Sequence, residues 1–303
     1  METIWDVIIV GGGPAGLTSG IYTARHSLKT LILDGQKIGG RAHEAHWIEN
    51  YPGFPEGIEG HKLVELFHQQ ALRFGVQFHR ETVIGITDIG NMKMVSTRGG
   101  YYKTKSIIIA TGARRNQLSV PGENEFKGKG VSYCAICDGP FYKDKVVAVV
   151  GSGHEAVEDA LNLAEIATKV YAIPGSKSYS ETNLLEKIKQ NPKIQLLDGC
   201  EVAEIKGRDS VDSILLKGCS IDEVKTDGVF ILLEQVSNDN VLGDVGVILD
   251  KVGCIVVDRN QQTSIPGVFA AGDCCCSGSQ IVTAAGEGGK AALSVLRFIR
   301  SVN

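Results

Sequence analysis

The sequence lacks the features of a membrane protein and of a nucleic-acid-binding protein. No apolar run approaches the length of about 18 residues that a membrane-spanning helix needs. Basic residues are not in excess, because 31 lysines and arginines stand against 35 aspartates and glutamates, a net charge of −4. Proteins that bind the phosphate backbone usually carry a strong positive charge. We therefore expect neither a membrane nor nucleic acid as partner.

An export signal is also lacking, since the apolar run 7–10 begins almost at once and is short. A cytoplasmic protein is therefore expected, and cysteines there more often serve catalysis or metal binding than structural disulfides. The apolar content of 43% and the charged content of 22% are typical of a globular chain, and 303 residues fit two domains better than one. Glycine is abundant, at 37 residues. This abundance indicates tight turns or close approach of the backbone to a ligand.

The first 34 residues carry the pattern of a dinucleotide-binding unit. A buried strand is predicted at 6–10, a glycine-rich turn at 11–16, a helix at 17–25 and a second strand at 30–33, followed by Asp34. Strand, turn, helix, strand and terminal acid, in this order, are typical of the βαβ unit that binds a dinucleotide.

Each glycine of the GxGxxG pattern in this turn has a physical role. Gly11 permits the sharp turn, Gly13 lets the backbone approach a pyrophosphate, and Gly16 lets the helix pack closely on the strand. The N-terminus of the helix can then hold the phosphates, while Asp34 can accept a hydrogen bond from a ribose hydroxyl.

A second copy of the pattern follows later in the chain. A strand is predicted at 146–150, a turn at 151–156, a helix at 157–166 and a strand at 169–173. Two such units in one chain indicate two related nucleotide domains. Further predicted elements are a buried strand ending in a glycine turn at 106–112, a linker at 114–130, a strand ending in an acid at 267–273 and a final amphipathic helix at 293–299.

Five motifs together resemble the low-molecular-weight thioredoxin reductases, flavoproteins of the class II pyridine nucleotide-disulfide oxidoreductase type. They are GGGPAG at 11–16, ENYPGF at 49–54, ATG at 110–112, CAICD at 134–138 and AGD at 271–273. They occur in the family's order and span the whole chain. The resemblance implies an α/β fold with two Rossmann-like, three-layer ββα domains, the second inserted into the first. It places an FAD-binding domain at 1–113 and 242–303, an inserted NAD(P)H-domain-like domain at 114–241, and implies a homodimer.

The residues of the CxxC motif indicate disulfide chemistry. Cys134 and Cys137 lie one helical turn apart and can alternate between dithiol and disulfide, and Asp138 can relay the protons. Half of a zinc site is the alternative, but such a site needs four ligands and no second CxxC or histidine spacing completes it, so no metal is expected. By resemblance, Cys137 faces the flavin and Cys134 attacks the disulfide of thioredoxin or a thioredoxin-like protein.

The resemblance also assigns an FAD site. It places the first turn and Asp34 at the adenosine end, Asn50 near the isoalloxazine, Asp273 on the ribitol, and Gln280 and Ala285 where the last segment passes the flavin ring. Asp273 could instead be a simple cap at the end of a strand. The full set of expected cofactor-binding residues is Gly11, Gly13, Pro14, Ala15, Gly16, Asp34, Gly40, Asn50, Ala110, Thr111, Gly112, Gly272, Asp273, Gln280, Ile281 and Ala285.

The second dinucleotide unit departs from an NADPH-binding member of the family. Such a member carries arginines after the second strand that clamp the 2′-phosphate. Here 174–180 contains no arginine and only Lys177 as a cation, while His154 and Glu155 occupy the turn. The segment 114–241 holds 15 basic and 20 acidic residues, a net −5. NADPH is therefore doubtful as donor, and we expect ferredoxin or a reduced deazaflavin. A weakened NADPH site is the alternative.

Other readings of the chain stay open at this point. A ferredoxin or pyridine-nucleotide flavin oxidoreductase would share the fold but lack the CxxC, and a flavin redox sensor would use the pair as a switch. The segment 234–238 departs from the family's usual turn, which concerns the hinge between the domains. Cys200, Cys219 and Cys254 look isolated and inert. The triplet 274–276 is either a set of small buried residues or an auxiliary thiol relay.

Overall fold

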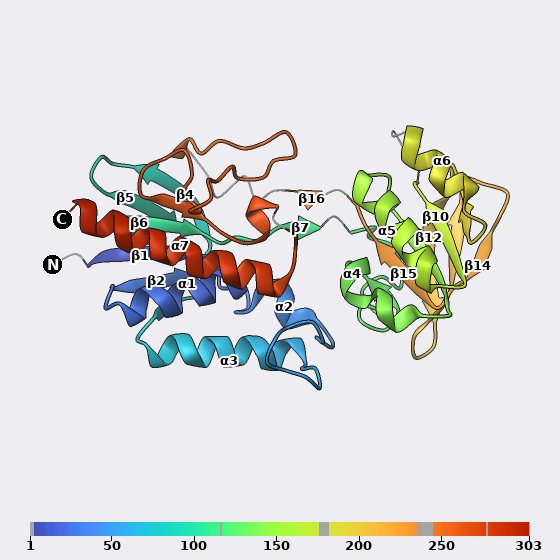
Figure 1. Cartoon of the computed structure of the whole chain (residues 1–303), viewed down its shortest axis with the longest axis horizontal. Helices are drawn as coiled ribbons and strands as arrows, with labels where there is room; N and C mark the ends of the chain where they lie inside the picture. The colour runs from blue at the N-terminus through green and yellow to red at the C-terminus, as the bar shows by residue number, and fades with distance from the viewer. Residues whose placement is uncertain are drawn as a thin grey trace. The chain divides into compact units, whose positions relative to one another are not determined.

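The computed structural model describes residues 3–115, 117–175, 182–233, 235–236, 245–276 and 278–302. The chain divides into two compact units. One comprises Met1–Arg114 with Ser237–Asn303 and the other comprises Arg115–Val236, so the first unit is built from both ends of the chain (Figure 1).

The first unit is built on a mixed sheet, which has seven strands within the described residues. The order is β3-β2-β1-β6-β5-β4, and β17 also pairs with β6. The strands β1, β2, β3, β6 and β17 run parallel, whereas β4 and β5 form an antiparallel extension from β6. Their bounds are Ile4–Val10 for β1, Thr30–Leu33 for β2, Gln77–His79 for β3, Val83–Asp88 for β4, Lys93–Thr97 for β5, Gly100–Ile109 for β6 and Val268–Ala270 for β17.

Continuous runs of β-branched residues explain why β1 and β6 occupy the centre of this sheet. A strand that is covered on both faces needs apolar side chains at every position rather than at alternate ones. Ile8, Ile9, Ile107, Ile108 and Ile109 have no exposed surface at all. The register pairs the ends of both strands, Val10 with Ile109, so the loops that follow leave the sheet at the same edge.

Helix α7 (Ile281–Val302) packs along α1 (Pro14–Arg25), as the red and blue helices of Figure 1 show. A Cβ atom on Gly288 would overlap the carbonyl oxygen of Ala15, so glycine is required for this close approach. The hydroxyl of Ser19 donates a hydrogen bond to the carbonyl of Gly288 at 2.9 Å. The sequence predicted the last helix only at 293–299, since the glycines of its first turns obscured the apolar period. The helices α2 (Gly40–Glu44) and α3 (Gly60–Arg73) complete this part of the unit.

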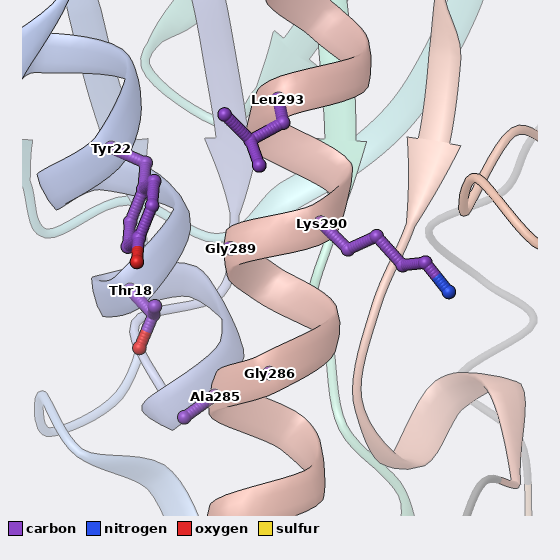
Figure 2. Close-up of a pocket in the computed structure, with 7 residues that line it drawn as sticks. All are labelled: Thr18, Tyr22, Ala285, Gly286, Gly289, Lys290 and Leu293. Carbon is purple, nitrogen blue, oxygen red and sulfur yellow. The ribbon is translucent and has the colours of Figure 1, made fainter.

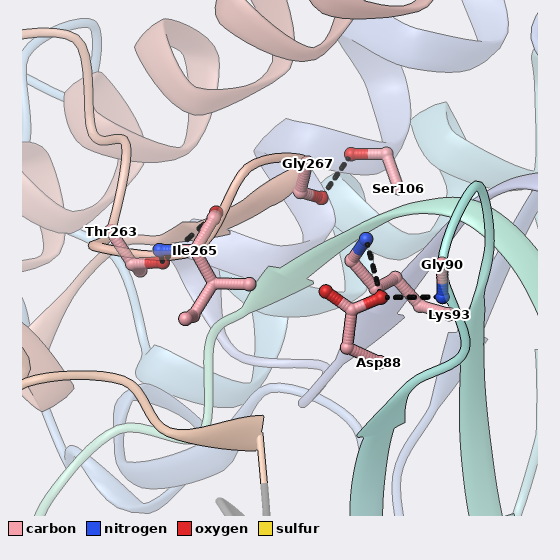
Figure 3. A network of polar contacts seen from close by, with 7 residues as sticks. All are labelled: Asp88, Gly90, Lys93, Ser106, Thr263, Ile265 and Gly267. Atoms are coloured by element: carbon pink, nitrogen blue, oxygen red, sulfur yellow. Dashed lines mark hydrogen bonds and ion pairs between the residues drawn. The ribbon is translucent and has the colours of Figure 1, made fainter.

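Figure 3 shows polar contacts that join the C-terminal segment to the sheet and that close the hairpin of β4 and β5. The hydroxyl of Ser106 in β6 donates to the carbonyl of Gly267, just before β17, at 2.8 Å. In the hairpin of β4 and β5, Lys93 pairs with Asp88 at 3.3 Å, and the same carboxylate accepts from the backbone N–H of Gly90 at 3.0 Å. The Lys93 side chain is 5% exposed, so the carboxylate supplies the partner that a buried ammonium needs.

The second unit repeats the strand–helix–strand pattern. Within the described residues, a parallel sheet has the order β11-β10-β9-β15-β8 and a small antiparallel sheet has the order β12-β13-β14. The short strand β7, whose first residue belongs to the first unit, pairs with β16. The strands are β7 Arg114–Arg115, β8 Val131–Ser132, β9 Val146–Val150, β10 Lys169–Ile173, β11 Ile194–Leu196, β12 Glu201–Gly207, β13 Val211–Lys217, β14 Glu223–Lys225, β15 Gly228–Ile231 and β16 Gln235–Val236. The helices are α4 Ala135–Asp138, α5 His154–Ile166 and α6 Thr182–Gln190, with the 3-10 turns η1 Gly139–Tyr142 and, in the first unit, η4 Asp273–Cys275. The predicted α/β class is confirmed.

Two disulfides show that the prediction of isolated, inert cysteines was wrong. Cys200 is bonded to Cys219, with 5.1 Å between their Cα atoms, and Cys254 is bonded to Cys276, with 5.8 Å between theirs. Both distances lie in the range typical of disulfides. The first bond forms because Cys200 precedes β12 and Cys219 follows its antiparallel partner β13. Sequence separations of 19 and 22 residues gave no sign of these pairings.

Over the part of the chain that the structure describes, no helix is long and apolar enough to cross a membrane. The same residues contain no group of three or more histidine, cysteine or acidic side chains placed to hold a metal ion.

Candidate functional site

The first dinucleotide turn leaves open space at the N-terminus of α1. Gly13 is the N-cap residue, and a Cβ atom built on it would meet nothing within 4 Å. Gly40 faces the same space, because its Cβ atom would lie 3.6 Å from the Cα of Gly13. The first turn of α1 holds no acidic side chain. Backbone N–H groups at the N-terminus of a helix whose first turn holds no carboxylate fit a pyrophosphate.

Two further glycines of the turn are fixed by packing. Gly11 has a φ of 108°, and a Cβ atom on it would overlap the carbonyl oxygen of Ala110 and lie 3.2 Å from the Cα of Thr111. A Cβ atom on Gly16 would in turn overlap the carbonyl oxygen of Gly11. The structure therefore brings the predicted residues of the first turn together with Ala110 and Thr111.

Asp34 follows β2 and is held at the mouth of the turn. One carboxylate oxygen accepts a hydrogen bond from the N–H of Gly12 at 2.6 Å, and the other accepts from the N–H of Gln36 at 2.7 Å. Each oxygen of an ionised carboxylate has two acceptor sites, so both keep capacity for a further donor. The carboxylate is thus oriented to accept from a hydroxyl group.

The end of β17 brings a second group of predicted residues together. Asp273 forms an ion pair with Arg41, whose guanidinium donates a hydrogen bond to the carboxylate at 3.0 Å. The N–H of Gly272 donates to Glu287 at 2.7 Å. The side-chain amide of Asn50 donates to the side-chain oxygen of Gln280 at 3.1 Å. Gln280 directly precedes Ile281, the first residue of α7.

Sequence reasoning missed Arg41 and Glu287. A signal for Arg41 existed, since a cation follows the glycine pair 39–40 that faces the first turn. Glu287 gave none, because it is one of several polar residues on a helix. The structure therefore adds a cation beside the predicted ribitol carboxylate.

Two other predicted residues lie apart from these contacts. Gly112 has a φ of 67°, a left-handed conformation that favours glycine. Ala285 borders a pocket of about 310 Å³ between α1 and α7 (Figure 2). The pocket is lined by Thr18, Tyr22, Ala285, Gly286, Gly289, Lys290 and Leu293.

Taken together, the residues of the first unit fit FAD. Backbone donors at Gly13 suit its pyrophosphate, the carboxylate of Asp34 suits a ribose hydroxyl, and Asp273 with Arg41 offers an acceptor and a cation at the end of a parallel strand. The sheet edge where β1, β6 and β17 end is the edge at which α/β folds bind ligands.

The second unit carries the dithiol in its disulfide form. Cys134 and Cys137 are bonded, with 5.3 Å between their Cα atoms, and both are half-buried. The N–H of Cys137 donates to the sulfur of Cys134 at 3.2 Å. Ile136, between them, is 66% exposed. The bond therefore lies at the surface of the unit, beside an apolar side chain.

A serine that the sequence did not single out holds Asp138. The hydroxyl of Ser132 donates to the carboxylate of Asp138 at 2.6 Å, and the N–H of Cys134 donates to the same hydroxyl oxygen at 3.1 Å. Ser132 thus links the predicted proton carrier to the backbone of the first cysteine. Burial, followed by the nearby charges of Asp138 and Asp227, raises the pKa of Tyr142 to about 12, so this phenol stays neutral near the dithiol.

The second dinucleotide turn differs electrostatically from the first. Gly153 caps α5 as Gly13 caps α1, but Glu155 lies in the first turn of α5. His154 pairs with Glu158 one turn along, at 3.1 Å. A carboxylate at this helix end already interacts favourably with the helix dipole and repels an incoming phosphate. Of the altered segments, 176–181, which includes Lys177, and positions 234, 237 and 238 lie outside the described residues.

The comparisons with known proteins cover nearly the whole chain. A family model described as pyridine nucleotide-disulphide oxidoreductase matches residues 5–288. The thioredoxin reductase of Aquifex aeolicus (strain VF5) is 40% identical over 307 residues, which cover 98% of this chain and 94% of that protein. The crystal structure of thioredoxin reductase from Streptococcus pyogenes MGAS5005 has a TM-score of 0.94 and 35% identity, and covers 99% of this chain and 100% of that one.

A third match is to a solved structure whose name includes ferredoxin. The crystal structure of a ferredoxin-flavin thioredoxin reductase from Clostridium acetobutylicum has a TM-score of 0.56 and 32% identity, and the match covers 99% of each chain. Together these likenesses confirm the resemblance that the five motifs indicated.

Proposed function

Since the chain belongs to the pyridine nucleotide-disulphide oxidoreductase family, we propose that it is an FAD-dependent disulfide reductase whose substrate is thioredoxin or a thioredoxin-like protein. The observation that carries this proposal is the Cys134–Cys137 disulfide with Asp138 and Ser132 beside it. A disulfide at the surface, next to a positioned carboxyl group, can be opened and re-formed repeatedly.

FAD, when bound, supplies the pair of electrons that reduces this disulfide. The residues that would hold it are those of the first turn, Asp34, Asn50 and Asp273, with Gln280 and Ile281 at the start of α7. Arg41 would add a cation beside Asp273. These roles rest on the fit of the side chains and on the resemblance.

The protein's own groups then carry out the exchange. Reduction breaks the bond between Cys134 and Cys137, and the Cys137 N–H stabilises negative charge on the Cys134 sulfur. Cys134 attacks the partner's disulfide and forms a mixed disulfide, which Cys137 resolves by attacking Cys134. Asp138, oriented by Ser132, supplies a proton to the leaving thiolate of the partner.

The electron donor that we propose is not NADPH but a reduced ferredoxin or a reduced deazaflavin. Three features support this: Glu155 in the first turn of α5, the lack of arginine in 174–180, and the net −5 of segment 114–241. The likeness to a ferredoxin-flavin thioredoxin reductase is in keeping with it.

Anaerobic titration of the purified flavoprotein tests the donor. We expect reduced ferredoxin or reduced deazaflavin to bleach the flavin absorbance, and NADPH or NADH at micromolar concentration to leave it unchanged. Bleaching by NADPH would overturn this part of the proposal. A Glu155→Gln variant serves as control: if a weakened NADPH site operates, loss of this charge should lower the NADPH concentration needed for bleaching.

Measurements of thioredoxin-disulfide turnover distinguish the proposed reductase from two other functions, a flavin oxidoreductase and a redox sensor. A flavin oxidoreductase that does not use the CxxC would keep its activity in Cys134→Ser with flavin still bound, whereas we expect that variant to lose thioredoxin reduction. A redox sensor would bind flavin and cycle its disulfide but show no turnover of thioredoxin disulfide with a supplied donor. A homodimer, which the family resemblance implies, remains a prediction that light scattering of the purified protein checks.

A further inference from the structure

Four cysteines of the first unit gather in one region, three of them directly after Asp273 and the fourth, Cys254, joined to them by a disulfide. Cys254 is bonded to Cys276, and the sulfurs of Cys274 and Cys275 lie 3.9 Å apart. Cys274 and Cys275 are the free cysteines among the described residues. A disulfide and two thiols therefore share one small region of the fold, outside the site with Cys134.

The loop that carries Cys254 is built to present it to Cys276. The carboxylate of Asp250 accepts from the N–H groups of Val252 and Cys254, each at 2.9 Å, and the N–H of Asp250 donates back to the Cys254 carbonyl at 2.9 Å. The N–H of Ile255 donates to the carbonyl of Cys274 at 2.9 Å. The two segments are thus joined by backbone contacts next to the disulfide, which orient both cysteines.

The two sulfurs of this disulfide differ in accessibility. Cys254 is 5% exposed, whereas Cys276 is an exposed residue at the end of η4. Ile248 and Val252 of the same loop are 57% and 71% exposed. An incoming thiol therefore approaches the bond from the side of Cys276, and the exposed apolar side chains of the Cys254 loop suit a protein partner.

The two neighbouring thiols are engaged by groups of their own surroundings. The sulfur of Cys274 donates to the carbonyls of Ile109 and Ala271, at 3.5 and 3.4 Å. Contact with Cys274 and burial raise the pKa of Cys275, with smaller contributions from Glu287 and Asp273. Thiolate is the attacking species in disulfide exchange. With Cys274 bonded to backbone carbonyls and the pKa of Cys275 raised, we expect the reductant of this disulfide to come from outside the cluster.

We propose that Cys254–Cys276 is a second thiol–disulfide exchange site, which is reduced by an external protein dithiol that attacks Cys276. This inference goes beyond the proposed function, because it needs neither flavin nor the Cys134–Cys137 pair. Cys276 lies three residues after Asp273, so opening the bond releases one end of the segment that we expect to hold FAD.

The exchange balances without a further reagent. A thiolate of the dithiol forms a bond with the Cys276 sulfur, and the bond to Cys254 breaks, with its electron pair leaving on the Cys254 sulfur, which takes up a proton. The second thiol of the partner then attacks the partner's own sulfur in the mixed disulfide and expels Cys276 as thiolate. The dithiol is oxidised by two electrons and the Cys254–Cys276 disulfide is reduced by two.

A titration of the intact flavoprotein with dithiothreitol tests the site directly. After acid quenching and alkylation, peptide mass spectrometry reports each cysteine, and Cys200–Cys219 is the matched control because Cys200 is 2% exposed and Cys219 is half-buried. At each dithiothreitol concentration we expect Cys254 and Cys276 to open together at least about tenfold faster than the control pair, since access governs the rate of exchange. Opening of both pairs together, or opening of Cys254–Cys276 only on unfolding, would overturn the proposal.

A pair of variants tests which sulfur is attacked. Cys254→Ser and Cys276→Ser lose the same cross-link, but each leaves the other cysteine as a free thiol. The reaction of that thiol with 5,5′-dithiobis(2-nitrobenzoic acid), followed by mass spectrometry, therefore compares the accessibility of the two sulfurs. We expect Cys276 to react at least about tenfold faster than Cys254 in folded proteins with matching melting curves. Equal rates would refute attack at Cys276. If either variant melts early, the dithiothreitol titration of the unaltered chain decides.

Discussion

The first turn permits a sharp test, because two of its glycines meet opposite surroundings. A Cβ atom on Gly13 meets nothing within 4 Å, and the φ of −76° and ψ of −175° suit alanine. A Cβ atom on Gly16 overlaps the carbonyl oxygen of Gly11. Gly13→Ala therefore adds a methyl group to open space, where we expect the pyrophosphate, while Gly16→Ala adds the same group to a packed contact.

The two substitutions should change different quantities: Gly13→Ala mainly the FAD affinity, and Gly16→Ala the free energy of unfolding. For Gly13→Ala, alanine restricts the unfolded chain but is a poorer N-cap than glycine, so the free energy of unfolding of the apoprotein should stay within about 0.5 kcal/mol. FAD affinity should fall by one charge-assisted hydrogen bond or more, about 1.5 to 3 kcal/mol, which is about 10- to 150-fold in Kd. For Gly16→Ala, forced movement of the backbone should lower the free energy of unfolding by about 1 to 3 kcal/mol or more.

Apoprotein of each variant would be titrated with FAD by flavin fluorescence quenching, and its stability measured by urea unfolding followed by circular dichroism. Gly13→Ala should separate binding from stability, whereas Gly16→Ala should lower both. If Gly13→Ala binds FAD as tightly as the unaltered chain, the pyrophosphate does not lie at this turn, and the assignment of the first turn as the pyrophosphate site is wrong. If Gly16→Ala is as stable as the unaltered chain, the packing argument is wrong.

Three further predictions concern the second unit. Cys219→Ser should lower the unfolding free energy of that unit by about 3 kcal/mol, the loop-closure value for a separation of 19 residues, but leave turnover unchanged in a disulfide-reduction assay; a melting curve like that of the unaltered chain would contradict it. Ser132→Ala should slow thioredoxin reduction about tenfold and change its pH profile, because Asp138 loses the hydrogen bond that positions it. The control is Ser213→Ala, which removes a hydrogen bond of the same 2.6 Å length to Glu223 and should leave the rate and the pH profile unchanged. Equal effects of the two variants would refute the role of Ser132. The raised pKa of Tyr142 means that the folded state holds this proton more tightly, so its stabilising contribution is present below about pH 10 and lost as the pH rises to about 12. Urea unfolding of Tyr142→Phe across that range should show a weaker loss, and an identical pH dependence would contradict the assignment.

The parts of the fold that sequence predicts well are those in which one local pattern has one physical solution. The buried run of β1, the glycines of the first turn and the acid after β2 each restrict the backbone in a different way, and they agree. The observed α1 begins at Pro14 rather than at residue 17, since proline suits the first turn of a helix.

Contacts between distant segments were beyond prediction from the residues. Arg41 and Asp273 are separated by 232 positions, and nothing in either neighbourhood specifies the other. The pairing of Cys254 with Cys276 depends on a loop held by Asp250, and that of Cys200 with Cys219 on the register of β12 and β13. Ser132 could have been singled out, because a hydroxyl two residues before Cys134 lies at the end of a strand.

The construction of the first unit from both ends of the chain has a consequence for biosynthesis. β17 pairs with β6, and α7 packs on α1, yet both elements are synthesised after the whole of the second unit. The second unit, Arg115–Val236, is a compact unit that has been synthesised in full by that stage, and domains generally fold as units. During translation β1, α1 and β6 are therefore made well before β17 and the 22-residue helix α7, which cover part of their apolar surface.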